Sequence, residues 1–186
     1  MGSFEELRAR CLGCTACRLS ETRTNVVFGM GDEKSPVLFV GEGPGEQEDL
    51  QGQPFVGRSG KLLDDFLAAV ELDRSKVYIA NIVKCRPPKN RDPLPDEEEA
   101  CIGYLREQVR LIGPKLIVCL GRIAACKLIR PDFKITTERG TYTEKAGILM
   151  TATFHPAAVL RDPRKKADMF SDFIEIKHRY DQFINA

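Results

Sequence analysis

The sequence has no long hydrophobic run and almost no net charge. Its longest uninterrupted apolar stretch, Leu116 to Leu120, is far too short to cross a membrane. The first residues lack the charged and then apolar layout of a signal peptide, so we expect a cytoplasmic protein. The 28 basic and 27 acidic residues give a net charge of +1 and no overall attraction for nucleic acid. Any DNA-binding face must therefore come from local clusters of charge.

The sequence also lacks the even number of cysteines that is typical of a fully disulfide-bonded protein. It has seven, and in a reducing cytoplasm this favours metal ligands or reactive thiols over a framework of disulfides. We expect Cys119 and Cys126 to be buried as small hydrophobic residues, because Cys119 lies inside an apolar run and Cys126 follows two alanines. Five cysteines remain to be explained.

Apolar residues form four short continuous runs with helix-like segments between them. The runs cover residues 37–40, 77–80, 116–120 and 148–154, and each is typical of a fully buried strand. Apolar residues at helical spacing, with a capping box at Ser3 and Glu6, predict helices after Ser3 and near residues 62–70, 96–112, 123–129 and 169–184. This alternation predicts an α/β fold with a parallel sheet covered on both faces. The absence of an internal repeat or long linker indicates a single domain, residues 1–186.

One group of cysteines has the spacing of a metal site. Cys14 and Cys17 form a close pair, and Cys85 and Cys101 flank the proline-rich stretch from Arg86 to Pro95. Four thiolates suit zinc or an iron–sulphur cluster, and the spacing does not decide between them. Another reading makes Cys85 and Cys101 ordinary buried residues beside a CxxC redox pair. Cys11 extends the pair and could be mistaken for a ligand.

A glycine-rich loop with several carboxylates follows the first strand. It begins Gly41-Glu42-Gly43-Pro44-Gly45 and continues through Glu48 and Asp49. The loop has no phosphate-binding lysine, and its acidic groups would repel phosphate oxygens, so nucleoside triphosphate binding is disfavoured. Carboxylates beside a glycine turn suit the positioning of a water or the stabilisation of a cationic sugar during glycosidic bond cleavage. The alternative is a solvated acidic loop.

Two further polar residues follow strands. Asn81 ends the second strand, and His155, one of only two histidines, follows the fourth and precedes Pro156, which favours a tight turn. Residues at the carboxyl ends of parallel strands meet at one edge of the sheet. We therefore expect both to converge with the glycine-rich loop in one pocket. His178 lies between basic residues, which is typical of a surface position.

Taken together, these segments resemble the family 4 uracil-DNA glycosylases, the iron–sulphur branch of that superfamily, over nearly the whole chain. The resemblance rests on Cys14-x-x-Cys17-x-Leu19, Gly41-Glu42-Gly43-Pro44-Gly45, Gly52-x-Pro54-Phe55-Val56-Gly57, Asn81-Ile82-Val83-Lys84-Cys85-Arg86-Pro87-Pro88, Cys101 and Phe154-His155-Pro156-Ala157. It implies a three-layer α/β/α fold with a central four-stranded parallel sheet. It also implies a hydrolase that flips out and excises uracil from DNA, leaving an abasic site, and a [4Fe–4S] cluster held by Cys14, Cys17, Cys85 and Cys101.

The resemblance also implies roles for the pocket residues. Asn81 would hydrogen-bond the uracil edge, Phe55 would stack on the base, and His155 would donate to the departing uracil anion. Family 4 characteristically has alanine or glycine at the place of Gly43, so the water-activating carboxylate must lie elsewhere. We expect Glu42 or Glu48 to orient the water or stabilise the sugar cation, with Asp49 in reserve. The substrate site would then comprise Glu42, Gly43, Glu48, Phe55, Asn81 and His155.

Contacts with DNA are expected from two further segments. Leu160 and Arg161 follow His155 and would act as a wedge that fills the vacated base stack. One basic patch would consist of Lys84, Arg86, Lys89 and Arg91, and a second of Arg161, Arg164, Lys165 and Lys166. The expected partner is uracil-containing DNA, single- or double-stranded, bound by a monomer.

Two other classes of protein fit parts of this pattern. An iron–sulphur electron-transfer or redox-sensing protein would use the cysteines and treat the glycine-rich loop as a turn. A zinc-bound nucleic-acid-binding module would use the cysteines and the basic patches. Neither class explains Asn81, Phe55 and His155 together.

Overall fold

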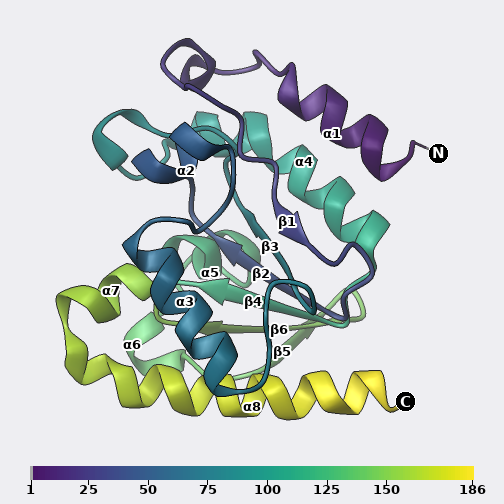
Figure 1. Ribbon diagram of the computed structural model, residues 1–186, viewed down its shortest axis with the longest axis vertical. Helices are drawn as coiled ribbons and strands as arrows, with labels where there is room; N and C mark the ends of the chain where they lie inside the picture. Colours follow the sequence, from purple (N-terminus) through teal and green to yellow (C-terminus); the bar gives the residue numbers. More distant parts are fainter. Residues whose placement is uncertain (1) are drawn as a thin grey trace.

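A six-stranded sheet forms the centre of the computed structural model, which describes residues 2–186 (Figure 1). In the order β1-β3-β2-β4-β6-β5, the strands are Met30–Gly31, Tyr78–Asn81, Val37–Gly41, Leu116–Leu120, Ile148–Thr153 and Thr143–Lys145. The four central strands run parallel, and β1 and β5 pair antiparallel at the two edges. The predicted α/β fold is confirmed, and two short edge strands make the sheet larger than the four strands expected.

Helices cover both faces of this sheet. They are α1 Phe4–Leu12, α2 Glu46–Gln51, α3 Arg58–Ala69, α4 Pro95–Ile112, α5 Arg122–Leu128, α6 Ile135–Glu138, α7 Pro156–Arg161 and α8 Lys166–Ile184. Short 3-10 turns occur at Arg18–Glu21, Pro88–Asn90 and Pro163–Lys165. Helices α1, α4 and α5 pack on one face, and α3, α7 and α8 on the other, as the two layers of Figure 1 show.

The strand sequences explain why both faces are covered. Every residue of β2 is buried, and alternate side chains enter opposite cores. Leu38 and Val40 pack with α1, α4 and α5, whereas Val37 and Phe39 pack with α3 and α8. The same continuous burial holds for β4. Strands buried on both faces are expected to be apolar throughout, as these are.

Several local predictions can be compared with the structure. The capping box at Ser3 and Glu6 is present at the start of α1. Cys119 is fully buried as predicted, but Cys126 is only half-buried, with its sulphur 3.6 Å from the Phe133 carbonyl oxygen. The tight turn expected after His155 is instead the start of α7, because proline is well suited to the first position of a helix.

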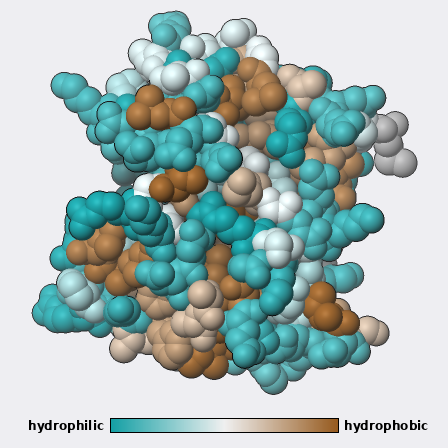
Figure 2. Space-filling model, viewed as in Figure 1, coloured by the Kyte–Doolittle hydropathy of each residue, from teal (hydrophilic) through white to brown (hydrophobic). Residues whose placement is uncertain are grey.

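The surface in the view of Figure 2 is largely hydrophilic, with apolar side chains in separate patches. Leu12, Leu50, Leu160 and Ile184 are exposed, and each belongs to a different helix. Within residues 2–186, no helix is long and apolar enough to span a membrane.

Candidate active site

A cavity of about 660 Å³ opens at the carboxyl ends of the central strands. Its wall includes Glu42 after β2, Asn81 at the end of β3, Gly121 after β4 and His155 after β6. The strand-end rule thus places the predicted residues together. Phe55, Gly43 and Glu48 line the same cavity, and Arg161 lies at it too. Asp49 does not line it, because its carboxylate accepts from the backbone N–H groups of residues 24 and 25.

Gly41 makes room for two of the pocket side chains. A Cβ atom at this position would lie 2.4 Å from Asn81 Oδ1 and 2.6 Å from Phe55 Cζ. Any side chain there would displace the amide or the ring. The last residue of β2 must therefore be glycine for Asn81 and Phe55 to occupy this part of the pocket.

The amide of Asn81 is the unusual polar group of the site. Its Oδ1 is the one buried side-chain nitrogen or oxygen within residues 2–186 that has no hydrogen-bond partner. Asn81 is 2% exposed and lines the cavity. A buried acceptor without a partner costs about 1–3 kcal/mol, so such a group is typical of a site that receives a ligand donor.

Phe55 is held in a strained backbone conformation. Its φ of 52° lies in the left-handed region, at a cost of about 1–3 kcal/mol for a residue with a side chain. Arg74 donates to the carbonyl of Pro54 at 2.6 Å and to the carbonyl of Phe55, and its Nε donates to Asp64 at 2.7 Å. A Cβ on Gly60 would lie 1.8 Å from the Phe55 carbonyl oxygen. Gly60 and Arg74, of which sequence patterns did not single out Arg74, thus fix the Phe55 backbone.

His155 is a neutral hydrogen-bond donor. Its Nδ1 accepts from the backbone N–H of Ala157 at 3.0 Å, which assigns the ring proton to Nε2. Burial, with a contribution from the Arg161 charge, lowers the pKa of His155 to about 4, against the opposing charge of Glu48. Its ring centroid lies 5.6 Å from that of Phe55. At neutral pH the imidazole therefore carries one N–H, on Nε2, because Nδ1 accepts the backbone N–H of Ala157 in α7.

The two carboxylates of the glycine-rich loop have different surroundings. Burial, followed by the charge and hydrogen bond of Asp92, raises the pKa of Glu42 to about 7. Glu48 accepts from three backbone N–H groups: Val56 and Gly57 at 2.8 Å through Oε1, and Gly45 at 3.1 Å through Oε2. Glu42 is therefore poised to exchange a proton, and Glu48, in the first turn of α2, ties Gly45 to the Val56-Gly57 segment before α3.

The residues predicted to contact DNA lie at different depths. Leu160 is 39% exposed on α7, and Arg161 is exposed at the cavity. Arg86 is partly buried, with its Nε donating to Asn90 Oδ1 at 2.7 Å. The prediction that Lys84 belongs to a surface patch is wrong, because its side chain turns into the core and is 1% exposed.

Other patch residues have acidic partners. Arg91 pairs with Glu97, and Arg164 and Lys165 pair with Asp162. Arg122, which the sequence analysis missed, is exposed at the cavity beside Asp92. Its position directly after β4 is the signal that could have identified it. Asp92, in the proline-rich stretch, offered no such signal.

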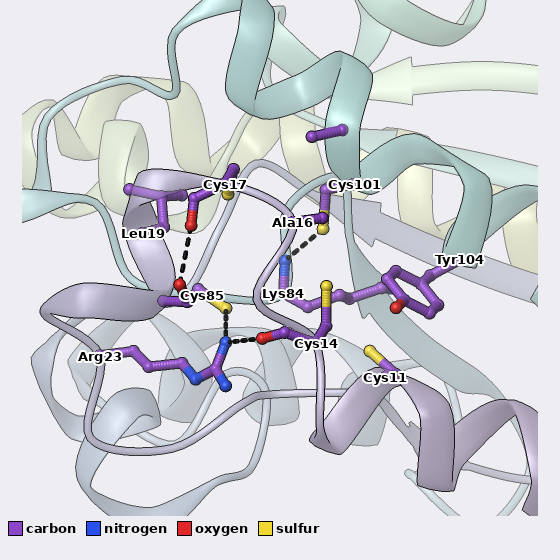
Figure 3. Close-up of a pocket in the computed structure, with 12 residues that line it drawn as sticks. Cys11, Cys14, Ala16, Cys17, Leu19, Arg23, Lys84, Cys85, Cys101 and Tyr104 are labelled. Atoms are coloured by element: carbon purple, nitrogen blue, oxygen red, sulfur yellow. Dashed lines mark hydrogen bonds between the residues drawn. The ribbon is translucent and has the colours of Figure 1, made fainter.

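The four predicted cysteine ligands come from three separate segments and meet at a second site. In Figure 3 the sulphurs of Cys14, Cys17, Cys85 and Cys101 point toward a common space. The Lys84 backbone N–H donates to Cys101 Sγ at 3.2 Å. Arg23 Nη1 lies 3.4 Å from Cys85 Sγ. Among residues 2–186, no three histidine, cysteine or acidic side chains form a group suited to one metal ion.

The chain is similar to known uracil-DNA glycosylases. Residues 28–176 match the Uracil DNA glycosylase superfamily. The chain is 44% identical to the type-4 uracil-DNA glycosylase of Archaeoglobus fulgidus, over 95% of this chain and 92% of that protein. It is 45% identical to the type-4 uracil-DNA glycosylase of Thermotoga maritima, over 86% of this chain and 84% of that protein. The chain belongs to the type-4 uracil-DNA glycosylases, hydrolases of N-glycosyl bonds that remove uracil from DNA.

Proposed function

We propose that the cavity receives a flipped uracil and that Asn81 reads its edge. The observation that carries this proposal is the buried Asn81 Oδ1 without a partner. The N3–H of uracil is a donor that would satisfy this acceptor, while the Asn81 amide nitrogen would donate to the uracil O4. Cytosine presents an acceptor at N3 and a donor at position 4, so it would leave Oδ1 unpaired. Discrimination against cytosine follows from that mismatch.

Phe55 and His155 serve the same base. The fixed Phe55 ring provides a stacking face for the extruded uracil. His155 Nε2–H donates to the uracil O2, where negative charge develops as the glycosidic bond breaks. A neutral imidazole suits this role because it does not protonate the anion prematurely. The lowered pKa of His155, to about 4, keeps the ring neutral at physiological pH.

Glu42 is the better of the two carboxylates for orienting the attacking water or stabilising the cationic sugar. It lines the cavity, and its raised pKa of about 7 suits a general base near neutral pH. Glu48 lines the cavity as well, but its three backbone hydrogen bonds favour a role in holding the loop. Gly43 lines the cavity and packs closely against Val83, since a Cβ there would lie 2.7 Å from Val83 Cγ2.

DNA would approach along the cavity opening. Leu160 and Arg161 project from α7, which begins at His155, so a side chain inserted into the base stack would lie close to the flipped base. Arg86 and Arg161 would contact phosphates. We propose that the chain works in the cytoplasm as a single-domain monomer on single- or double-stranded DNA.

The second site suits a [4Fe–4S] cluster held by Cys14, Cys17, Cys85 and Cys101. Such a cluster takes four thiolates and binds each to a different iron, so its ligands stand farther apart than those of a single ion. N–H donors to sulphur, as at Lys84 and Arg23, are typical of such sites. The group would supply a cross-link between three chain segments. It would take no part in the cleavage of the glycosidic bond.

The experiment that tests the pocket measures free uracil released from an oligonucleotide with one deoxyuridine. His155→Ala should lower the rate by about 100-fold or more, as expected for one lost donor to a developing anion. His178→Ala is the matched control, because His178 lies on the surface of α8 and contacts Gln182. Cytosine and thymine strands should yield no free base. Equal rates for His155→Ala and the parent would overturn the assignment.

A further inference from the structure

A fully buried lysine lies between the pocket and the cysteine site. Lys84 is 1% exposed and follows β3 by three residues. Lysine is among the residues least often buried, because removing an ammonium from water is costly unless it is paired. The steps assigned to the pocket do not use this side chain, so its place in the core calls for another explanation.

The contacts of Lys84 reach both sites. Its Nζ donates to the backbone carbonyl of Asn81 at 2.9 Å and to Gln108 Oε1 at 2.7 Å. Gln108 is held in turn, since its Nε2 donates to the Phe28 carbonyl at 2.9 Å. The backbone N–H of Lys84 donates to Cys101 Sγ. Figure 3 shows Lys84 among the cysteines that line the second site.

The short segment that contains Lys84 also contacts the glycine-rich loop. Ile82 N–H donates to the Gly41 carbonyl at 3.0 Å, and Val83 N–H donates to the Glu42 carbonyl at 3.1 Å. Movement of this segment would therefore shift Asn81 relative to the loop that faces it.

We propose that Lys84 is a positioning residue that links the cysteine site to the uracil-reading amide. Its backbone holds a cluster ligand, and its ammonium holds the carbonyl of the residue whose side chain reads the base. The proposal rests on the assignment of Asn81 as that reader. An ammonium suits the place better than a neutral side chain, because its two acceptors, the Asn81 carbonyl and Gln108 Oε1, are both buried.

The test uses Lys84→Met, which keeps an unbranched side chain one heavy atom shorter and removes its charge and donors. The readout is the inhibition constant of free uracil in the release assay, with the visible absorbance of the cluster recorded on the same sample. We expect inhibition to weaken by about tenfold or more, the usual effect of losing a hydrogen bond from a charged donor. Absorbance per protein should stay unchanged, because the backbone N–H to Cys101 remains.

A double-mutant cycle separates positioning from general damage. In the Asn81→Ala background, Lys84→Met should change the inhibition constant by less than about twofold, because the amide through which Lys84 acts is gone. If Lys84→Met weakened inhibition by the same factor in the parent and in the Asn81→Ala background, the proposed link would be overturned. An unchanged inhibition constant in folded Lys84→Met would overturn it as well. Lys76→Met is the matched control, since that ammonium lies at the surface and donates to the Glu71 carbonyl.

Two further results complete the design. If Lys84→Met does not fold, Gln108→Met is used in its place. It keeps the buried Lys84 ammonium and removes the amide oxygen that accepts one of its hydrogen bonds. The proposed link predicts that uracil inhibits Gln108→Met more weakly than the parent, and that this effect is not additive with Asn81→Ala. An unchanged inhibition constant in Gln108→Met would overturn the proposal. If Asn81→Ala is inhibited by uracil like the parent, Asn81 is not the reader, and the proposal falls with the assignment on which it rests.

Discussion

Glu42 and Glu48 lie close together in the sequence, but their carboxylates have different contacts and therefore suit different roles. Glu48 accepts three backbone N–H bonds, from Gly45, Val56 and Gly57. Glu42 lies beside Asp92 in a partly desolvated place, which stabilises the protonated form. The sequence presents both as acidic residues near a glycine turn. Only the contacts of the two side chains distinguish Glu42, the proposed proton acceptor, from Glu48, which holds the backbone around it.

The difference predicts a pH profile. Because the pKa of Glu42 is about 7, the rate of uracil release at saturating substrate should rise with pH, with a midpoint near that value. Glu42→Gln should lower the rate by about 100-fold and flatten the rise. Glu48→Gln should keep the midpoint and lower the thermal midpoint of unfolding. A parent rate that is constant from about pH 6 to pH 8 would contradict the role of Glu42 as base.

The same shift predicts how stability changes with pH. Folding raises the pKa of Glu42, so the native state binds this proton more tightly than the unfolded chain does. The carboxylate then destabilises the fold increasingly as the pH rises from 4.5 to about 7. Glu42→Gln removes it, so the thermal midpoint of this variant should exceed that of the parent above about pH 8 and approach it near pH 4.

At the scale of elements, α7 connects the proposed donor to the base with the proposed DNA wedge. The helix begins with His155 as its N-cap, and Leu160 lies within the same short helix with its side chain 39% exposed. A wedge on this helix is needed only where a base stack must be opened. Leu160→Ala should therefore lower uracil release from a duplex by about tenfold and leave release from a single strand unchanged, since extrusion from a stack costs a few kcal/mol.

The control for the wedge is another exposed leucine. Leu12 lies on α1, and its substitution by alanine should change neither rate. Equal losses by Leu160→Ala on single-stranded and duplex substrate would indicate damage to the pocket. No loss on the duplex would exclude the wedge.

Elements with strong local patterns could be predicted from the sequence. Strands β2 and β4 are apolar throughout, and both were placed correctly from that pattern. Edge strands β1 and β5 were missed, because β1 has two residues and all three residues of β5 are exposed. The pocket followed from the strand-end rule, which brings Asn81 and His155 together. The roles of Arg74 and Lys84 could not be predicted, since nothing local shows that Arg74 reaches carbonyls 19 and 20 residues away or that the Lys84 side chain turns into the core.

At the scale of the whole molecule, the two sites share the segment between β3 and α4. Asn81 ends β3, Cys85 lies four residues later, and Cys101 belongs to α4. The other two predicted ligands, Cys14 and Cys17, come from the N-terminal part of the chain, after α1. That part packs against α4 through Leu7 and Cys11 in the same core. The cysteine site therefore joins the N-terminal segment to the strand that carries Asn81, the proposed uracil reader.

This arrangement predicts the effect of losing one cysteine ligand. Cys85→Ala should remove the visible absorbance and the bound iron, and should expose the segment around Cys14 and Cys17 to proteolysis, because its cross-link to β3 is gone. Cys126→Ala removes a half-buried cysteine that does not line the site, and should keep both the iron and the resistance to protease. Iron content and the positions of cleavage check both results. Full iron in Cys85→Ala would show that Cys11, which also lines the site, can replace a ligand. Full iron with unchanged resistance would contradict the assigned set of four.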